Sequence, residues 1–232
     1  MNAEIIGIGS ELLLGQIANT DAQYLSRQLS FLGIDVYWHT VVGDNRDRIL
    51  ETLHIASERS DIIITTGGLG PTMDDLSKET VAEFLGMDLA MHQPSLERIR
   101  NYFHSTGRTM TENNAKQAMF PEDAIILQND NGTAPGAIME KDGKSYIVLP
   151  GPPFELQPMF DHYVVPFLKR KSNQGIYSRV VRIFGIGESA VEEMVKDLLL
   201  NQQNPTLAPL IGVGEVTLRI TAKASSPEEG EK

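Results

Sequence analysis

Short apolar runs rich in isoleucine and valine alternate with helix-length amphipathic segments through the first 150 residues of this 232-residue chain. Residues 4–9, 34–42 and 61–68 predict β-strands, and the segments 21–32 and 45–59 predict helices that follow the first two strands. The unbroken run Ile62–Ile64 is typical of a central strand covered on both faces. This alternation predicts an α/β fold, a three-layer sandwich with a mostly parallel sheet.

Shorter elements are predicted between residues 77 and 171. Helices are expected from Ser77 as N-cap to residue 85, from Pro94 to residue 106, and over 111–119. Residues 124–128 and 145–149 predict strands, with a hairpin turn at 141–144. A further helical segment, bent or interrupted at Pro158 and Pro166, follows the proline-rich turn at 150–153.

A polar stretch without periodicity predicts a domain boundary near Ser172. We therefore predict a large domain over residues 1–171 and a small α+β domain over residues 172–224. The small domain is expected to contain strand 178–184, helix 188–200, and strands near 206–211 and 215–222. Residues 225–232 are acidic and poor in apolar side chains, which predicts a disordered tail.

Composition restricts the function classes. The chain has no cysteine, which excludes disulfides, thiolate metal sites and a cysteine nucleophile. No signal peptide and no membrane-spanning run are recognisable, so we expect a cytoplasmic protein without a membrane partner. The formal net charge of −11 disfavours nucleic acid as a partner. An anionic small ligand would need local backbone donors or a metal ion.

The most informative motif is TTGGLGPTMDDLSKET, residues 65–80. Closely spaced glycines between a buried strand and a helix allow backbone N–H groups to converge on an anion. Asp74 and Asp75 could hold a divalent cation that bridges phosphate oxygens. Alternatively, the glycines only form a sharp turn and the carboxylates favour the helix N-terminus. The motif lacks the lysine of a Walker loop.

Other loops at the same expected edge of the sheet carry weaker signals. In GIGSELLLG, Ser10 could donate to a phosphate, and Glu11 could ligate a metal or accept from a ribose hydroxyl, although both could simply shape a turn. Asp44 follows a strand and could face the same crevice, or only cap a helix. Gly151 permits close backbone approach and Pro152 stiffens the next turn.

Taken together, these motifs resemble a known family. The segments GSELLLGQIANTDAQYLSRQLSFLGIDV, VVGDNRDRI, ITTGGLGPTMDDLSKETVA, MTENNAKQA, GTAPG and LPGPPFEL occur in an order that resembles the N-terminal half of CinA, the competence/damage-inducible protein family. The stretch from Ser178 to about Ala224 resembles the KH-like domain that follows in that family. The resemblance covers nearly the whole chain.

The resemblance implies a domain with the fold of molybdopterin-binding proteins, which in some members hydrolyses ADP-ribose to AMP and ribose 5-phosphate with a divalent metal. The positions that match the ligand-binding motif are Asp44, Gly67, Gly68, Gly70, Thr72 and Asp75. Asp74 stands where an arginine is frequent in molybdopterin-binding relatives, which favours a metal-assisted reaction. No segment matches the family's amidohydrolase domain, so we expect no deamidase activity.

Our leading hypothesis is therefore metal-dependent hydrolysis of a nucleoside diphosphate compound, most simply ADP-ribose. The loop from Gly67 through Pro71 to Thr72 would cradle the pyrophosphate, and Asp44 and Asp75, with Asp74, would hold Mg²⁺ or a similar ion and carry the catalysis. Asn114 and Lys116 are candidates for further substrate contacts.

Two other interpretations stay open. The domain could bind molybdopterin or a nucleotide without turnover, or the chain could be an oligomerising regulatory subunit. The KH-like segment has Gly185-Ile186-Gly187-Glu188 in place of a G-x-x-G loop, which disfavours nucleic-acid binding and favours a structural or dimerisation role. A homo-oligomer, with a dimer favoured, is the expected assembly.

Overall fold

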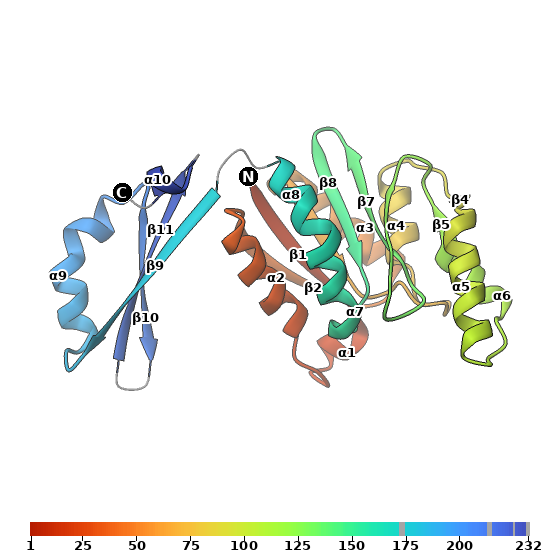
Figure 1. The fold of residues 1–232 in the computed structure, drawn as a ribbon, viewed down its shortest axis with the longest axis horizontal. Coiled ribbons are helices and arrows are strands. Elements are labelled where there is room, and N and C mark those ends of the chain that lie inside the picture. Colours follow the sequence, from red (N-terminus) through yellow and green to blue (C-terminus); the bar gives the residue numbers. More distant parts are fainter. Residues whose placement is uncertain (172–174, 213–214, 225, 231–232) are drawn as a thin grey trace. The chain divides into compact units, whose positions relative to one another are not determined.

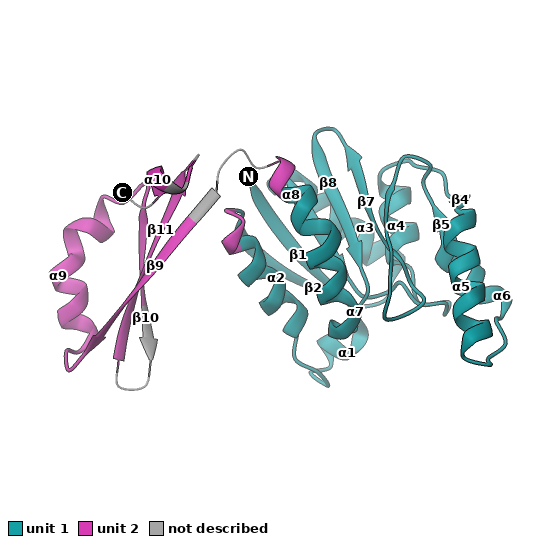
Figure 2. Cartoon of the chain, in the orientation of Figure 1, with its two compact units in different colours: residues 1–29, 34–168 teal, residues 30–33, 169–232 magenta. Residues whose placement is uncertain are grey.

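A computed structural model describes residues 1–171, 175–212, 215–224 and 226–230 (Figure 1). They form two compact units (Figure 2): unit 1 comprises residues 1–29 and 34–168, and unit 2 comprises residues 30–33 and the chain from residue 169 onward. The division falls just before the boundary expected near Ser172, which itself lies outside the described residues.

Unit 1 is built on a six-stranded sheet in the order β2-β1-β3-β8-β7-β6. The strands are β1 (Asn2–Ile8), β2 (Asp35–Val42), β3 (Ile62–Thr66), β6 (Ile125–Leu127), β7 (Gly136–Lys141) and β8 (Lys144–Leu149). The pairs among β2, β1, β3 and β8 are parallel, whereas β7 and β6 add an antiparallel edge. The predicted hairpin joins β7 to β8 through Asp142 and Gly143, both at positive φ. The mostly parallel sheet is thus confirmed.

Helices cover both faces of this sheet (Figure 1). They are α1 (Ser10–Leu13), α2 (Thr20–Phe31), α3 (Arg46–Arg59), α4 (Ser77–Phe84), α7 (Pro153–Met159) and α8 (Val165–Lys171), with α2, α7 and α8 opposite α3 and α4. Ile63 packs in one core cluster with Leu53 of α3 and Val81 of α4. Ile62 and Ile64 are equally buried, and strand alternation directs them to the other face. The expected three-layer arrangement follows.

Two short segments differ from the sequence expectation. The helix predicted over 111–119 is α6 (Glu112–Ala115), continued by a 3₁₀ turn, η1 (Lys116–Ala118). The chain then turns extended because β5 (Met119–Phe120) pairs with β4 (Ala90–Met91) beside α5 (Gln93–Ser105). Ser77 does not cap α4: it is the first residue of that helix, and its hydroxyl donates to the carbonyl of Gly67 at 2.7 Å.

The segment after β8 stays helical in spite of its prolines. Pro158 lies inside α7, a π-helical stretch, η2 (Phe160–Val164), follows, and Pro166 lies in α8. A π turn is one way in which a helix absorbs a local break in its regular hydrogen bonds. The expected interruption is therefore a change of helix type, which keeps Phe160 and Val164 buried.

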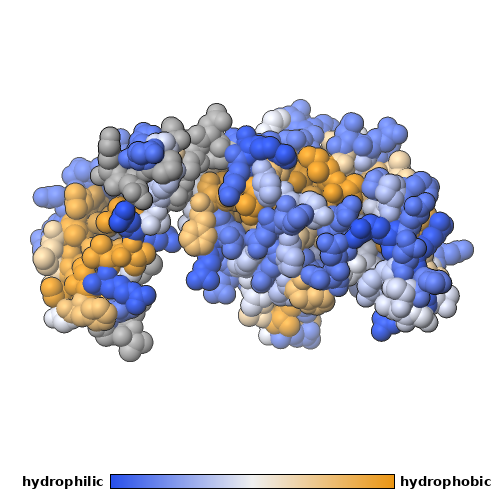
Figure 3. Space-filling model, viewed as in Figure 1, coloured by the Kyte–Doolittle hydropathy of each residue, from blue (hydrophilic) through white to orange (hydrophobic). Residues whose placement is uncertain are grey.

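Unit 2 has an antiparallel sheet in the order β10-β11-β9. Its elements are β9 (Gly175–Phe184), α9 (Glu188–Leu200), β10 (Thr206–Gly212), β11 (Glu215–Ala224) and α10 (Pro227–Gly230). Val191 of α9 packs against Val216 and Leu218 of β11. Exposed apolar side chains gather on this unit (Figure 3), among them Val180, Val181, Phe184, Met194, Leu198 and Leu200.

The segment expected to be a disordered tail contains the helical turn α10, which contacts β9 and β11, while residues 225, 231 and 232 lie outside the described residues. Among the described residues of both units, no helix has the length and apolar character that crossing a membrane requires.

Candidate functional site

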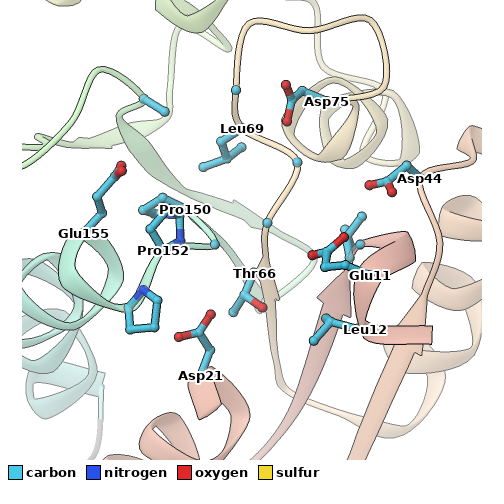
Figure 4. A pocket seen from close by; sticks show the side chains of 18 of the residues that line it. Glu11, Leu12, Asp21, Asp44, Thr66, Leu69, Asp75, Pro150, Pro152 and Glu155 are labelled. Carbon is cyan, nitrogen blue, oxygen red and sulfur yellow. The ribbon is translucent and has the colours of Figure 1, made fainter. Parts of the chain in front are cut away.

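A cleft of about 910 Å³ opens where β1, β3 and β8 end (Figure 4). The carboxyl ends of parallel strands are where α/β proteins commonly bind ligands. Its wall comes from the loops after these strands and after β2, from the start of α2 and α7, and from η1. It includes Glu11, Asp21, Asp44, Thr66, Gly67, Gly68, Leu69, Gly70, Pro71, Thr72, Asp74, Asp75, Gln117, Gly151, Pro152 and Glu155. Eleven of the predicted residues therefore line one cleft: Glu11, Asp44, Gly67, Gly68, Gly70, Pro71, Thr72, Asp74, Asp75, Gly151 and Pro152.

The loop after β3 requires glycine at two positions. Gly67 and Gly68 have φ angles of 92° and 64°, which other residues rarely adopt. A Cβ on Gly67 would lie 2.2 Å from the carbonyl oxygen of Ile8, and one on Gly68 equally close to the hydroxyl oxygen of Ser77. In the neighbouring loop after β8, a Cβ on Gly151 would reach only ordinary contact, 3.4 Å from the Cα of Gly67. Gly67 and Gly68 therefore do form a sharp turn, and this turn does not by itself exclude a role in binding.

Four carbonyl groups of this loop, at residues 67, 68, 69 and 72, accept hydrogen bonds from other parts of the protein. Ser77 donates from its hydroxyl to the carbonyl of Gly67 at 2.7 Å and from its amide to the carbonyl of Gly68 at 3.1 Å. The side-chain amide of Gln117 donates to the carbonyl of Leu69 at 3.3 Å. The Lys116 ammonium donates to the carbonyl of Thr72 at 2.5 Å. These bonds hold the loop by its acceptors.

The amide groups of the same loop are only partly used. Gly67 donates to the carbonyl of Leu149 at 3.1 Å, and Thr72 donates to the Asp75 carboxylate at 2.8 Å. Between them, the amides of Gly68, Leu69 and Gly70 have no hydrogen-bond partner among the described residues. The expected cradle over residues 67–72 is therefore reduced to three amides, since Pro71 has none to offer.

Three predicted contact residues lie outside the cleft lining. Lys116 holds the turn from behind, because its ammonium also donates to the carbonyl of Asp75 at 2.7 Å. Asn114 is buried, and its side-chain oxygen accepts from the amide and hydroxyl of Thr111, which caps α6. Ser10 donates from its amide and its hydroxyl to Asp44, each at 2.9 Å. All three side chains support other protein groups, so a direct contact between them and a ligand in the cleft is not what this geometry favours.

The carboxylates that the sequence singled out are held by neighbouring donors. Asp44 Oδ2 accepts both bonds from Ser10, and Asp75 Oδ2 accepts from the amide of Thr72. The Thr72 hydroxyl lies close to both Asp74 and Asp75, and its hydrogen bond lowers the pKa of Asp74. Asp44 and Asp75 each keep one carboxylate oxygen, Oδ1, that accepts no bond from the described residues. These oxygens are available to a ligand or a cation.

The geometry fits a cation only if a ligand completes its coordination. In the part of the chain that the structure describes, no three or more histidine or acidic side chains are grouped so that they could hold a metal ion by themselves. Magnesium is usually held by one or two carboxylates together with phosphate oxygens and water. Asp44 and Asp75 fit that pattern through their free oxygens.

Sequence reasoning missed several residues of the cleft, among them the polar residues Asp21, Gln117 and Glu155. Asp21 begins the first turn of α2 and points into the cleft near Thr66 (Figure 4); its Oδ1 is buried without a partner, and burial raises the pKa of this carboxyl to about 6. Gln117 is only 2% exposed and spans from η1 to the loop. Asp21 was interpreted only as the start of a helix, and no sequence signal links Gln117 to a loop 48 residues away.

Comparison with known proteins places both units in described families. Residues 4–170 match the family described as "Probable molybdopterin binding domain", and residues 178–232 match the "Damage-inducible protein CinA KH domain". Unit 1 is thus a domain of the molybdopterin-binding type. The chain belongs to the CinA family.

Relatives and solved structures agree with this assignment. A competence-damage inducible protein of Thermoanaerobacter pseudethanolicus is 62% identical over 229 residues, which are 99% of this chain and 55% of that protein. One of Bacillus cereus is 55% identical over 233 residues, or 57% of its length, so the chain spans little more than half of these relatives.

A solved structure of CinA from Thermoplasma acidophilum is 35% identical, with a TM-score of 0.64 over 69% of this chain and 94% of that one. A molybdopterin biosynthesis protein from Mycobacterium abscessus shares only 16% identity, with a TM-score of 0.50 over 73% of this chain and 92% of that one, and supports the fold alone.

Proposed function

We propose that unit 1 binds a nucleoside diphosphate compound of the ADP-ribose type and hydrolyses its diphosphate, with a divalent cation, to AMP and ribose 5-phosphate. The observation that carries this proposal is the polarity of the loop after β3. Four of its carbonyls are bonded to Ser77, Gln117 and Lys116, while three consecutive amides, at residues 68–70, have no hydrogen-bond partner among the described residues and belong to the cleft lining.

Free backbone donors are the means by which an acidic protein can bind an anion. Six carboxylates line the cleft, so a diphosphate would be repelled unless local dipoles and a cation offset their charge: Glu11, Asp21, Asp44, Asp74, Asp75 and Glu155. Fixed amides cost no reorganisation when charge develops on the phosphate oxygens during the reaction. The same amides can therefore bind the ground state and stabilise the transition state.

Asp44 and Asp75 would hold the cation, which when bound offsets phosphate charge and lowers the pKa of a bound water. Both carboxylates are fixed from one side, by Ser10 and by the Thr72 amide, so their free oxygens have defined positions. From there they can orient a water toward phosphorus. One P–O bond of the diphosphate bridge breaks as the water oxygen forms the new one, and the water's proton is passed to a carboxylate.

The test is to incubate the pure protein with ADP-ribose and a series of divalent metals and to measure AMP. We expect AMP formation that needs metal and falls at least about a hundredfold in Asp75→Asn, the scale of losing a group that acts on the reacting centre. The matched control is Asp123→Asn, an exposed aspartate outside the cleft lining, which should keep the activity. Equal AMP formation by the wild type and Asp75→Asn would contradict the proposal.

A second function is favoured by one observation: among the described residues, no set of three or more acidic or histidine side chains could hold a metal ion by itself. The cleft could then bind a nucleotide or a pterin without turnover, as the match to a molybdopterin-binding domain allows. Calorimetry with ADP-ribose and with a pterin separates the two. Tight binding with the ligand recovered unchanged, in the presence of metal, would support the binding module over the hydrolase.

A further inference from the structure

A buried lysine contacts the residues that hold the loop after β3. Lys78, the second residue of α4, is 3% exposed. Its ammonium donates to the carbonyls of Lys116 at 2.9 Å and Gln117 at 3.3 Å, and it lies 4.5 Å from the ring centre of Phe120. The nearest carboxylate in an ion pair with it, Glu79, is 3.9 Å away. A buried ammonium with so weak an ionic partner is costly, and an apolar side chain of equal length would pack there more cheaply.

The two carbonyls that Lys78 holds belong to the residues that hold the loop. The side chain of Lys116 bonds the carbonyls of Thr72 and Asp75, and the side chain of Gln117 bonds the carbonyl of Leu69. Each of these side chains starts from the short 3₁₀ turn η1, which has only one turn of internal hydrogen bonds to keep its position. The ammonium of Lys78 therefore connects the rigid helix α4 to the loop through η1.

We propose that Lys78 is a positioning residue for ligand binding. Its buried ammonium fixes the backbone of Lys116 and Gln117, whose side chains hold carbonyls of the loop. Lys78 thereby keeps these carbonyls bonded to the protein and leaves the amides of residues 68–70 for a ligand. The inference rests on the proposed function for its ligand, but the loop order that it predicts exists without ligand. The charge has a second effect, because a cation in a low-dielectric site behind the loop favours an anion in front of it.

The first test measures the loop itself, with no ligand. In Lys78→Met, the hydrogen-bonded amides of Thr72 and Asp75 should lose about tenfold or more of their protection against hydrogen exchange, the effect of removing hydrogen bonds to a charged group. The matched control is Lys141→Met, because Lys141 also donates its ammonium to a backbone carbonyl next to α4, that of Leu85, but away from the loop. It should leave Thr72 and Asp75 unchanged. Equal protection in Lys78→Met and the wild type would overturn the proposal.

The second test asks whether Lys78 acts through η1. Lys78→Met, Lys116→Met and the double variant are compared for protection of the same amides. If Lys78 acts through Lys116, the double variant loses no more than the larger single loss, whereas independent action would multiply the two losses. Multiplied losses would reject the proposed connection, even if both single variants loosen the loop.

The third test uses the pH and the ligand. Burial lowers the pKa of Lys78 to about 8, with Glu79 and Lys116 as the charged groups that face it. Protection of Thr72 should therefore decrease as the pH rises through about 8 in the wild type and not in Lys78→Met.

The affinity for ADP-ribose, measured by calorimetry, should fall in Lys78→Met and not in Lys141→Met. If Lys78→Met loosens the loop but the wild type binds no ADP-ribose, the proposed function is rejected and the role of Lys78 in loop order is kept. If Lys78→Met loosens the loop but binds ADP-ribose as tightly as the wild type, the role of Lys78 in binding is rejected.

Discussion

The half-buried carboxyl of Asp21 should destabilise the folded protein when it is ionised. Burial raises its pKa from an ordinary value of 3.8 to about 6. A shift of about two units corresponds to about 3 kcal/mol against the ionised form. Because the side chain is partly open to solvent, we discount this to about 1.5 kcal/mol. Replacement by asparagine also removes a favourable charge from the first turn of α2, worth about 0.5 kcal/mol.

Asp21→Asn should therefore stabilise unit 1 by about 1 kcal/mol at pH 8. A carboxyl whose folded pKa is raised stabilises the fold fully below its unfolded value and loses that contribution as the pH rises through the folded value, here about 6. At pH 4 most of the gain should be lost, since the Asp21 carboxyl is then neutral in the folded protein. Urea denaturation at the two pH values measures this, and the single tryptophan, Trp38 of β2, reports on unit 1.

The control is Asp123→Asn, because Asp123 is exposed and lies in the turn before β6. It should show no pH-dependent gain. A stability difference between Asp21→Asn and the wild type that is the same at pH 8 and pH 4 would refute the argument from burial. A loss of ligand binding in Asp21→Asn with unchanged stability would instead indicate that the buried oxygen is positioned for the ligand.

Four further substitutions, in three comparisons, test the packing that supports the site. Arg59→Met should destabilise unit 1 by about 3 kcal/mol, because it leaves the fully buried Glu4 carboxylate, now bonded by Arg59 at 2.7 and 2.8 Å, without its cation. Urea denaturation followed by circular dichroism measures this, and an unchanged stability would contradict it. Gly67→Ala should lower the free energy of unfolding by more than about 2 kcal/mol, because its Cβ would lie 2.2 Å from a backbone carbonyl oxygen. Gly151→Ala should leave the stability nearly unchanged, and equal melting temperatures of the two variants would contradict this. Ser77→Ala should cost about 1 kcal/mol and speed hydrogen exchange in the loop, since it removes the bond to the Gly67 carbonyl; unchanged exchange would show that the bond is dispensable.

Much of the fold could be predicted from the sequence because its signals are local. The run Ile62–Ile64 has no polar residue to face solvent, so a strand there must be covered on both faces, and the structure buries all three residues. The glycines at 67 and 68 and the hairpin at Asp142–Gly143 follow from φ angles that few other residues adopt. The helix expected over 111–119 was shortened because Met119 and Phe120 pair with β4, a contact that no local pattern records.

The sequence by itself also determined most of the loops that meet at one cleft, since loops after parallel strands lie at the same edge of the sheet. Only the tertiary structure decided what each residue does there. Which backbone groups of the loop are bonded depends on partners far along the chain, such as Leu149, which accepts from the Gly67 amide, and Gln117, which donates to the Leu69 carbonyl. The same long-range contacts assign Lys116 to support and bury Lys78 behind the loop, because side-chain reach and burial are properties of packing.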